Sequence, residues 1–344
     1  MIKIKISENQ MERISEIWFK WFIHGNRISE FIDVLDHDPI YRNMIFKSNI
    51  EYSSWKNEYQ IDESVKKDAT WREPIQKYIF ADLSDESVVV KKYKKRLQKK
   101  TIEFLISTYK KYRETTTIVK IINILKIDVC PYCNRNFMEN YSYKKKKYFK
   151  GDLDHHYSKD EIPALAIAFY NLVPSCKVCN HEKSDTTERT FFPFYDDEEK
   201  EYRFKIELYD DKVENDIITD TLIKDIESKR YDSTVWQGIS DNFNIRLRGV
   251  DKSELNECMM NSKEVFRLEK KYNHSKEYVR EIIRKTYIYP QTHKSILLNH
   301  FSEIFGDETA LLESFFSYYD DEKYLYSRPL SKLTKDILRQ LGVL

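Results

Sequence analysis

Two C-x-x-C pairs separated by a short segment constrain this chain more than any other feature of its sequence. The pairs are Cys130/Cys133 and Cys176/Cys179, and they contain four of the five cysteines. Each pair holds two thiolates on one turn of backbone, and two such turns together form the tetrahedral four-sulfur site that structural zinc favours. One pair alone would also suit a redox motif. Two pairs, in a chain without a secretory signal, predict bound zinc rather than disulfides or free thiols.

Such a zinc ion would have a structural role. With sulfur at all four positions, no coordination site is left for water, so the ion would hold the fold together and catalyse nothing. The fifth cysteine, Cys258, falls in a helical pattern and is predicted to be a core thiol. Any chemistry must therefore come from other residues between the cysteine pairs.

The segment between and just beyond the pairs carries a second pattern. Its residues are Asp154-His155, then Asn171, then Asn180 directly after the second pair, and finally Lys183. In this order and bracketing the sequence resembles the HNH endonuclease superfamily, in its zinc-bracketed ββα-metal branch. One residue departs from the usual letters, because Asn180 stands where many members have histidine.

These residue types suit phosphodiester hydrolysis, in which a base activates water and a cation stabilises the leaving oxygen. Histidine accepts a proton near neutral pH, and the resemblance assigns this role to His155. Asp154 and Asn180 offer the hard oxygen ligands that magnesium prefers, and manganese would serve as well. The resemblance further implies that Asn171 braces the active-site loop, and it makes Lys183 a candidate phosphate contact.

Three neighbouring side chains leave alternatives open. His181 would replace Asn180 as metal ligand if the register shifted by one residue. His156 should point to the face opposite His155, because side chains alternate along a strand, and it is interpreted as a packing or solvated histidine. Asp152 lies two residues before Asp154, on the same face, and is a candidate supporting carboxylate.

The expected fold class is α+β, with a small zinc-stapled ββα-metal core between mostly helical flanks. The expected domains are 1–128 (helical, for docking or nucleic-acid contact), 129–200 (nuclease module with zinc) and 201–344 (β-hairpin plus helices). Within the module, strands are expected at 136–143, 148–154 and 172–175, and helices at 161–170 and from about 179. A long helix is expected from 84 to 125, with one break near 115–117. Beyond the module, strands at 202–209 and 242–248 flank a helix at 217–229, and helices follow from 254 to the end.

The net charge of +1, from 58 basic and 57 acidic residues, does not by itself indicate a polyanionic partner. Only local runs of basic residues point to such a partner. The run Lys91–Lys100 holds seven basic residues in ten and no acid, and the tip Lys144–Lys147 holds four more. Such runs are either solvated or contact phosphates without reading sequence. The candidate contacts in the first run are Lys91, Lys92, Lys95 and Arg96.

The predicted function is cleavage of DNA by a magnesium-dependent endonuclease. Two alternatives stay open: cleavage of RNA, including transfer RNA, and a non-catalytic zinc-stapled module that binds nucleic acid or protein. The long flanks and the tail RPLSKLTKDILRQL resemble HNH subunits of Septu- and retron-type anti-phage systems, which implies an ATPase partner and a role in defence. No apolar run approaches the roughly 18 residues that span a bilayer, so a soluble, cytoplasmic protein is expected.

Overall fold

The computed structural model describes residues 1–144, 146–184, 186, 188–208, 232–250, 254–288, 291–317 and 325–344. By contacts the chain forms two compact units. The N-terminal unit comprises Ile4–Cys130 and Phe137–Thr187, and the C-terminal unit comprises Met1–Lys3, Pro131–Asn136 and Glu188–Leu344. The three functional ranges expected from the sequence follow other boundaries and stay a prediction.

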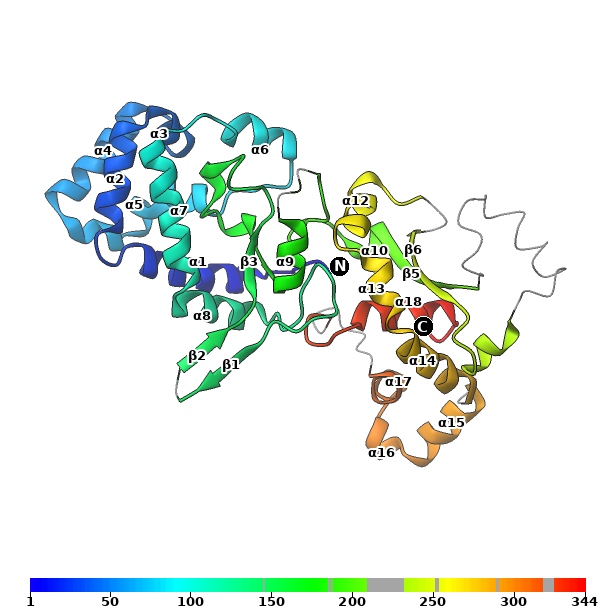
Figure 1. Cartoon of the computed structure of the whole chain (residues 1–344). Coiled ribbons are helices and arrows are strands. Elements are labelled where there is room, and N and C mark those ends of the chain that lie inside the picture. The colour runs from blue at the N-terminus through cyan, green and yellow to red at the C-terminus, as the bar shows by residue number, and fades with distance from the viewer. Residues whose placement is uncertain are drawn as a thin grey trace. The chain divides into compact units, whose positions relative to one another are not determined.

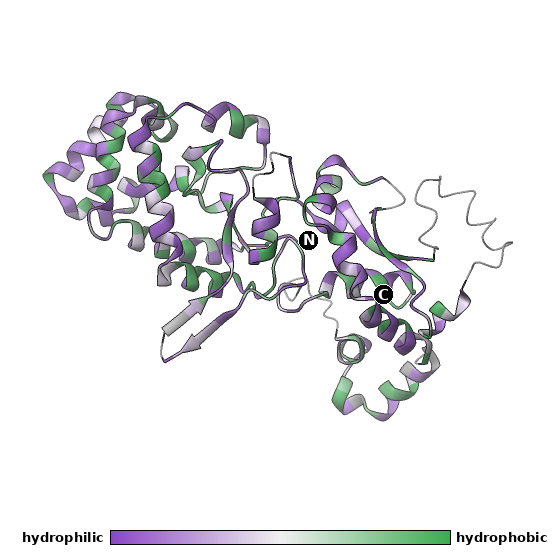
Figure 2. Ribbon diagram, in the orientation of Figure 1, coloured by the Kyte–Doolittle hydropathy of each residue, from purple (hydrophilic) through white to green (hydrophobic). Residues whose placement is uncertain are grey.

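The N-terminal unit is built mainly from helices (Figure 1), and its buried core contains many aromatic side chains. Its helices are α1 (Glu8–Phe22), α2 (Arg27–His37), α3 (Pro39–Ile45), α4 (Asn49–Ile61), α5 (Ala69–Ile79), α6 (Glu86–Tyr93), α7 (Lys99–Arg113), α8 (Thr116–Leu125) and α9 (Lys177–Lys183), with a 3-10 turn at Glu63–Lys67. Helix α1 begins with a capping box between Ser7 and Gln10, and it buries Ile14, Trp18 and Phe22. Figure 2 shows the resulting mixture of hydrophobic and hydrophilic residues along these helices.

The long helix expected from 84 to 125 has a second break, at 94–98, which the sequence analysis did not predict. The reason lies in a distant residue. The carboxylate of Asp38 accepts hydrogen bonds from the Gln98 N–H (2.8 Å) and the Thr101 hydroxyl (2.9 Å), and this starts α7 anew at Lys99. The basic run is therefore not one stiff cationic rod, because it includes the end of α6, a non-helical segment and the start of α7.

Two antiparallel strand pairs complete this unit: β1 (Asn140–Tyr143) with β2 (Lys146–Phe149), and β3 (Asp152–His155) with β4 (Leu172–Ser175). The expected strand 148–154 is interrupted at Gly151. The expected helix at 161–170 is instead two 3-10 turns, Pro163–Leu165 and Phe169–Asn171. The strand predicted at 172–175 is confirmed with the same bounds.

The C-terminal unit packs helices against an antiparallel pair, β5 (Tyr202–Glu207) and β6 (Asn244–Gly249), which lie where two strands were expected. Its helices are α10 (Glu198–Glu201), α12 (Glu257–Val265), α13 (Leu268–Asn273), α14 (Lys276–Ile288), α15 (Gln291–His300), α16 (Ser302–Phe305), α17 (Glu308–Phe316) and α18 (Ser331–Gln340), with a 3-10 turn at Ser233–Gln237. The helix expected at 217–229 lies outside the described residues.

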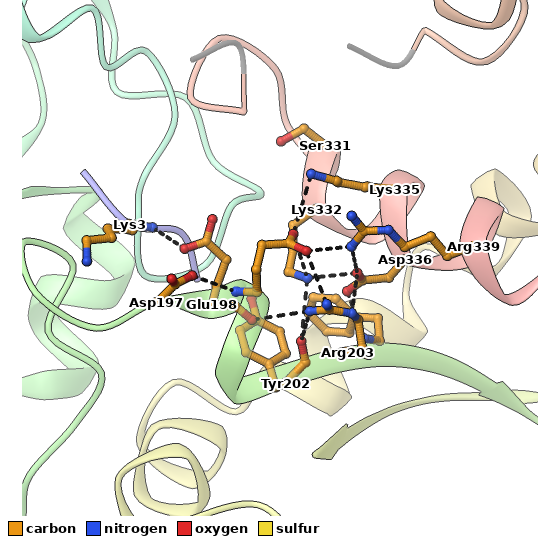
Figure 3. A network of polar contacts seen from close by, with 12 residues as sticks. Lys3, Asp197, Glu198, Tyr202, Arg203, Ser331, Lys332, Lys335, Asp336 and Arg339 are labelled. Atoms are coloured by element: carbon orange, nitrogen blue, oxygen red, sulfur yellow. Dashed lines mark hydrogen bonds and ion pairs between the residues drawn. The ribbon is translucent and has the colours of Figure 1, made fainter. Parts of the chain in front are cut away.

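Helix α18 carries a buried network of charges in this unit (Figure 3). The ammonium of Lys332 lies 2.7 Å from Asp336, one turn along the helix, and both side chains are fully buried. The other oxygen of Asp336 accepts the N–H of Phe204 on β5 (2.9 Å). Glu199 adds a second carboxylate, 3.4 Å from Lys332 and 2.5 Å from Arg339. The tail RPLSKLTKDILRQL thus contributes to the interior of its unit.

The fold class expected from the sequence is confirmed at the level of α+β, with many helices and small antiparallel sheets. Among the described residues, no helix combines the length and the apolar character needed to span a membrane.

Candidate active site and four-cysteine cluster

Cys130, Cys133, Cys176 and Cys179 form one buried cluster. Their sulfur atoms all lie within 4.8 Å of one another. A tetrahedron with zinc–sulfur bonds of about 2.3 Å has sulfur–sulfur edges of about 3.8 Å, so the donor set fits a zinc ion in type, number and spacing. The N–H of Cys179 points at the sulfur of Cys176 (3.5 Å), as Cys176 caps helix α9. The cluster could therefore hold a structural zinc.

Strands β3 and β4 and helix α9 bring the predicted catalytic residues together. The antiparallel register pairs Asp154 with Val173 and His155 with Leu172, and α9 packs against β3. Asp154 and His155 come from β3, Asn171 directly precedes β4, and Asn180 and Lys183 lie on α9. Residues separated by up to 29 positions in the sequence thus share one small two-strand and one-helix element.

The imidazole of His155 is fixed by two neighbours. Its Nε2 lies 3.0 Å from the carbonyl oxygen of Ala166, and its ring packs at 4.4 Å from the ring of Tyr109 on α7. Burial lowers the pKa of His155 to about 4, and this outweighs the opposite influence of the Ala166 carbonyl and the charge of Asp154. His155 is therefore neutral near pH 7.

Asp154 and Lys183 form a buried ion pair. The two side chains are 6% and 4% exposed, and the ammonium lies 3.2 Å from the carboxylate. Lys183 also donates to the carbonyl oxygens of His155 (2.8 Å) and His156 (3.1 Å). These three acceptors match the three N–H groups of an ammonium, so in this arrangement Lys183 positions the end of β3. The sequence analysis expected this lysine to contact a phosphate, and that role stays a prediction.

Asn171 is fully buried and ties two loops to the end of β3. Its amide oxygen accepts the N–H of Tyr157 (2.7 Å), and its amide nitrogen donates to the carbonyls of Tyr157 (3.1 Å) and Leu165 (3.0 Å). Its backbone carbonyl accepts the N–H of His156 (2.9 Å). These bonds connect both ends of the segment between β3 and β4, and the bracing role that the resemblance gives Asn171 stays a prediction.

The side chain of Asn180 contacts strand β3 at Asp152. The amide nitrogen of Asn180 donates to the Asp152 carboxylate (3.1 Å), which orients the amide oxygen as the remaining acceptor. His181, the alternative ligand, is exposed on α9. His156 is half-buried, with its ring 5.1 Å from that of Tyr157.

The basic candidates Lys91, Lys92, Lys95 and Arg96 are all exposed. They flank Lys94, whose ammonium pairs with Glu161 (2.8 Å) in the loop that follows β3. That contact connects the basic run to the loop between His155 and Asn171.

Three groups in the site were missed by the sequence analysis. Tyr109 packs on His155 and donates its hydroxyl to the carbonyl of Leu153 (2.9 Å), and burial raises its pKa. Arg113 lies 3.7 Å from Asp152, and the Ala166 carbonyl binds the imidazole. Tyr109 and Tyr112 follow the apolar spacing of α7, so nothing in the pattern distinguishes Tyr109 from an ordinary core residue.

No protein-family model matches the chain, and no curated protein or solved structure is significantly similar to it. Among the described residues, the four cysteines are the one group of three or more histidine, cysteine or acidic ligands close enough to hold a metal. Strands β3 and β4 and helix α9 therefore carry the chemistry from which a function can be inferred.

Proposed function

We propose that this protein is a metal-dependent HNH-type endonuclease that hydrolyses phosphodiester bonds of DNA. The observation that carries the proposal is the neutral, oriented imidazole of His155 at the end of β3, beside a buried carboxylate and braced by Asn171. Strands β3 and β4 followed by α9, with the cysteine cluster at the start of that helix, supply the element order of a ββα-metal core.

The hydrogen bond to Ala166 defines the tautomer of His155. A backbone carbonyl only accepts, so the neutral ring carries its proton on Nε2 and leaves the Nδ1 lone pair available. Nδ1 would take the proton of the attacking water. Tyr109 and the Lys183 contacts restrict how the ring can move, and such orientation is what a general base requires.

Asp154 and Asn180 would hold the catalytic magnesium or manganese ion, which is proposed on the hard oxygen character of their side chains. When bound, that ion stabilises charge on the scissile phosphate and the leaving oxygen. Because the Asn180 amide nitrogen donates to the carboxylate of Asp152, the amide oxygen of Asn180 would point away from Asp152 and be available to the ion. Lys183 would position the Asp154 carboxylate, since its ammonium lies 3.2 Å away in the same buried site.

DNA is proposed as the substrate on the resemblance alone, which also implies 5′-phosphate and 3′-hydroxyl ends. None of the site residues addresses a sugar, so RNA, including transfer RNA, is the alternative substrate. The same resemblance supports an effector role in bacterial anti-phage defence beside an ATPase partner. Copurification of the tagged chain with the products of its neighbouring genes tests that partner.

A non-catalytic binding module is the second candidate, and one observation favours it. Asp154 already pairs with Lys183 in a buried site, which satisfies the carboxylate without a divalent ion. In that case the zinc-stapled element would bind nucleic acid or protein and cut nothing.

The deciding experiment is an incubation of purified protein with supercoiled plasmid and with labelled RNA, in magnesium or manganese, beside His155→Ala and His181→Ala. We expect the wild-type protein and the His181→Ala control to nick or linearise the plasmid. We expect His155→Ala to cut about 10²–10⁴-fold more slowly, the usual contribution of a positioned base. The melting temperatures of the three proteins serve as the fold control.

Unimpaired cutting by His155→Ala would rule out this residue as the base. Cutting of RNA alone would replace DNA by the alternative substrate. Intact folding without cleavage of either substrate, by the purified protein or with its copurified partner, would favour the binding module.

A further inference from the structure

The hairpin of β1 and β2 presents one aromatic face that the proposed nuclease function does not use. Side chains alternate along a strand, and Tyr141 lies directly opposite Tyr148 while Tyr143 lies opposite Lys146. Tyr141, Tyr143 and Tyr148 therefore share a face. The rings of Tyr141 and Tyr148 stack at 5.3 Å, and Tyr141 and Tyr143 are 44% and 57% exposed.

The opposite face of the hairpin is the one that packs on the unit. The amide of Asn140 donates to Asn123 on α8 (3.0 Å), and β2 contacts that helix. Phe149 continues this face toward Gly151. In Figure 1 the hairpin extends beyond α8 and β3, and the exposed fractions of Tyr141 and Tyr143 show that their side chains are open to solvent.

The hairpin sequence is rich in positive charge, and two of its lysines lie close to the tyrosine rings. Residues 140–150 include five lysines and no acidic residue, although Glu139 flanks the base of the hairpin. The Lys144 ammonium lies 5.3 Å from the ring of Tyr143, and that of Lys150 lies 5.7 Å from the ring of Tyr148. Exposed aromatic rings with cations beside them suit a partner that offers both planar aromatic groups and negative charge.

We propose that this tyrosine face binds a single-stranded segment of nucleic acid, with bases stacked on the rings and lysines on the phosphates. Tyr141 and Tyr143 are spaced by about 6.8 Å, twice the rise per strand residue. Stacked bases in a duplex repeat at about 3.4 Å and hide their faces, so the wider spacing fits unstacked bases. A protein partner of acidic character would match the lysines but not the exposed ring ladder.

The inference deepens the proposed function, since it assigns the substrate a single-stranded stretch next to the cleavage site. Only Lys150 and Gly151 separate β2 from β3, which carries His155. A strand held on the tyrosines would therefore be bound within the same unit as the proposed base.

The test measures binding rather than cleavage. Full-length His155→Ala protein is titrated against a fluorescein-labelled 20-nucleotide DNA, single-stranded or as a duplex, and anisotropy gives the Kd. In that background, Tyr141→Ala/Tyr143→Ala is compared with Tyr141→Phe/Tyr143→Phe, which keeps the rings, and with Tyr287→Ala. Tyr287 is a suitable control because it is also exposed (62%, against 44% and 57% for Tyr141 and Tyr143) but lies on α14.

We expect the single strand to bind more tightly than the duplex, and the double alanine variant to bind it at least about tenfold more weakly. The phenylalanine and Tyr287→Ala variants should keep the parent Kd. Lys144→Gln/Lys150→Gln should lower the slope of log Kd against log salt by about 1.4, or about 0.7 per lysine.

An unchanged Kd in the double alanine variant, a preference for the duplex, or no binding of either DNA would overturn the inference. These outcomes are separable from failure of the nuclease proposal. If the wild-type protein cuts DNA but the tyrosines do not affect binding, only the inference fails. If the tyrosines govern binding and nothing is cut, only the nuclease proposal fails.

Discussion

Two buried lysine–aspartate pairs, one in each unit, use the same chemistry for different purposes. In α18 the pair Lys332 and Asp336 is surrounded by other charged groups, and its contacts join a helix to a strand. In the candidate site, Lys183 pairs with Asp154 and donates two further hydrogen bonds to backbone carbonyls at the end of β3. The first pair connects elements, whereas the second fixes the backbone carbonyls of His155 and His156 at the end of β3.

The difference between the two pairs predicts which one affects stability alone and which one also affects catalysis. A buried pair contributes little net stability compared with an apolar packing, but removing one partner costs about 3–5 kcal/mol. Both pairs should therefore be costly to break. Only the pair at Lys183 should also affect chemistry, because it lies beside the proposed base and the proposed metal ligand.

The largest effect is expected from Cys176→Ser. This substitution tests whether bound zinc stabilises the part of the fold that holds the Lys183–Asp154 pair. Cys176 caps α9 and belongs to the cysteine cluster, so loss of zinc should release the helix that carries Lys183. We expect loss of bound zinc and of more than about 4 kcal/mol of unfolding free energy. Metal analysis and a melting curve measure both.

Cys258→Ser is the matched control for that prediction. This thiol lies outside the cluster, and burial together with the nearby charge of Asp196 raises its pKa to about 12. The substitution should keep the zinc content and cost about 1 kcal/mol or less. Normal melting of Cys176→Ser without zinc would refute the structural role of the ion.

Lys183→Met should come next, because it removes the ammonium while keeping most of the side-chain volume. Asp154 would be left buried without its cation, and two carbonyls would lose their donor. We expect about 3 kcal/mol of lost stability and cleavage at least about 100-fold slower, equivalent to about 2.7 kcal/mol in the transition state. Denaturant titration and single-turnover cleavage separate the two effects.

Lys332→Met makes the same substitution in the other pair. We expect about 2–3 kcal/mol of lost stability, somewhat less than the full cost, since Arg203 and Arg339 remain near Asp336 (3.9 and 4.0 Å). Cleavage per folded molecule should not change. If cleavage falls as far as in Lys183→Met, the distinction between the two pairs is wrong.

The smallest effect is expected from Glu199→Gln and depends on pH. Burial alone would raise the pKa of Glu199, but Lys332, Arg339, Lys335 and Arg203 outweigh it and lower the pKa to about 2. A lowered folded-state pKa contributes stability above pH 4.5 that disappears as the pH falls toward 2.

Glu199→Gln should therefore be less stable than the wild-type protein at pH 7, by about 1–2 kcal/mol after allowance for partial solvation. The difference should close between pH 5 and about 2, as followed by thermal melting. A difference that is constant over this range would show that the charge of Glu199 is not its source.

Local patterns predicted the elements that local forces determine. The alternation in the two strands of the C-terminal unit was sufficient to find β5 and β6, and cysteine spacing was sufficient to find the cluster. The strand at 172–175 was expected as the return strand that leads into the second cysteine pair, and it is β4. The order of Asp154, His155 and Asn171 located the candidate site before any geometry was known.

Distant contacts account for what was missed. The break before α7 depends on Asp38, some sixty residues earlier, and the turns at 163–171 replace a helix because the Asn171 amide binds the carbonyl of Leu165. A lysine after a C-x-x-C pair is ordinarily solvated, so the burial of Lys183 has no sequence signal. The same holds for Tyr109, which has the spacing of any core tyrosine.

The backbone around Gly151 limits which residues can occupy positions 149 and 151 together. A Cβ atom at this position would stand 2.9 Å from Cε2 of the Phe149 ring, closer than real Cβ contacts come, and 3.0 Å from the Ser175 carbonyl oxygen, which is a tight contact. In descendants of this chain, loss of the glycine should therefore be accompanied by a smaller side chain in place of Phe149. The two positions are expected to covary, and that correlation would mark the hairpin and β3 as one inherited unit.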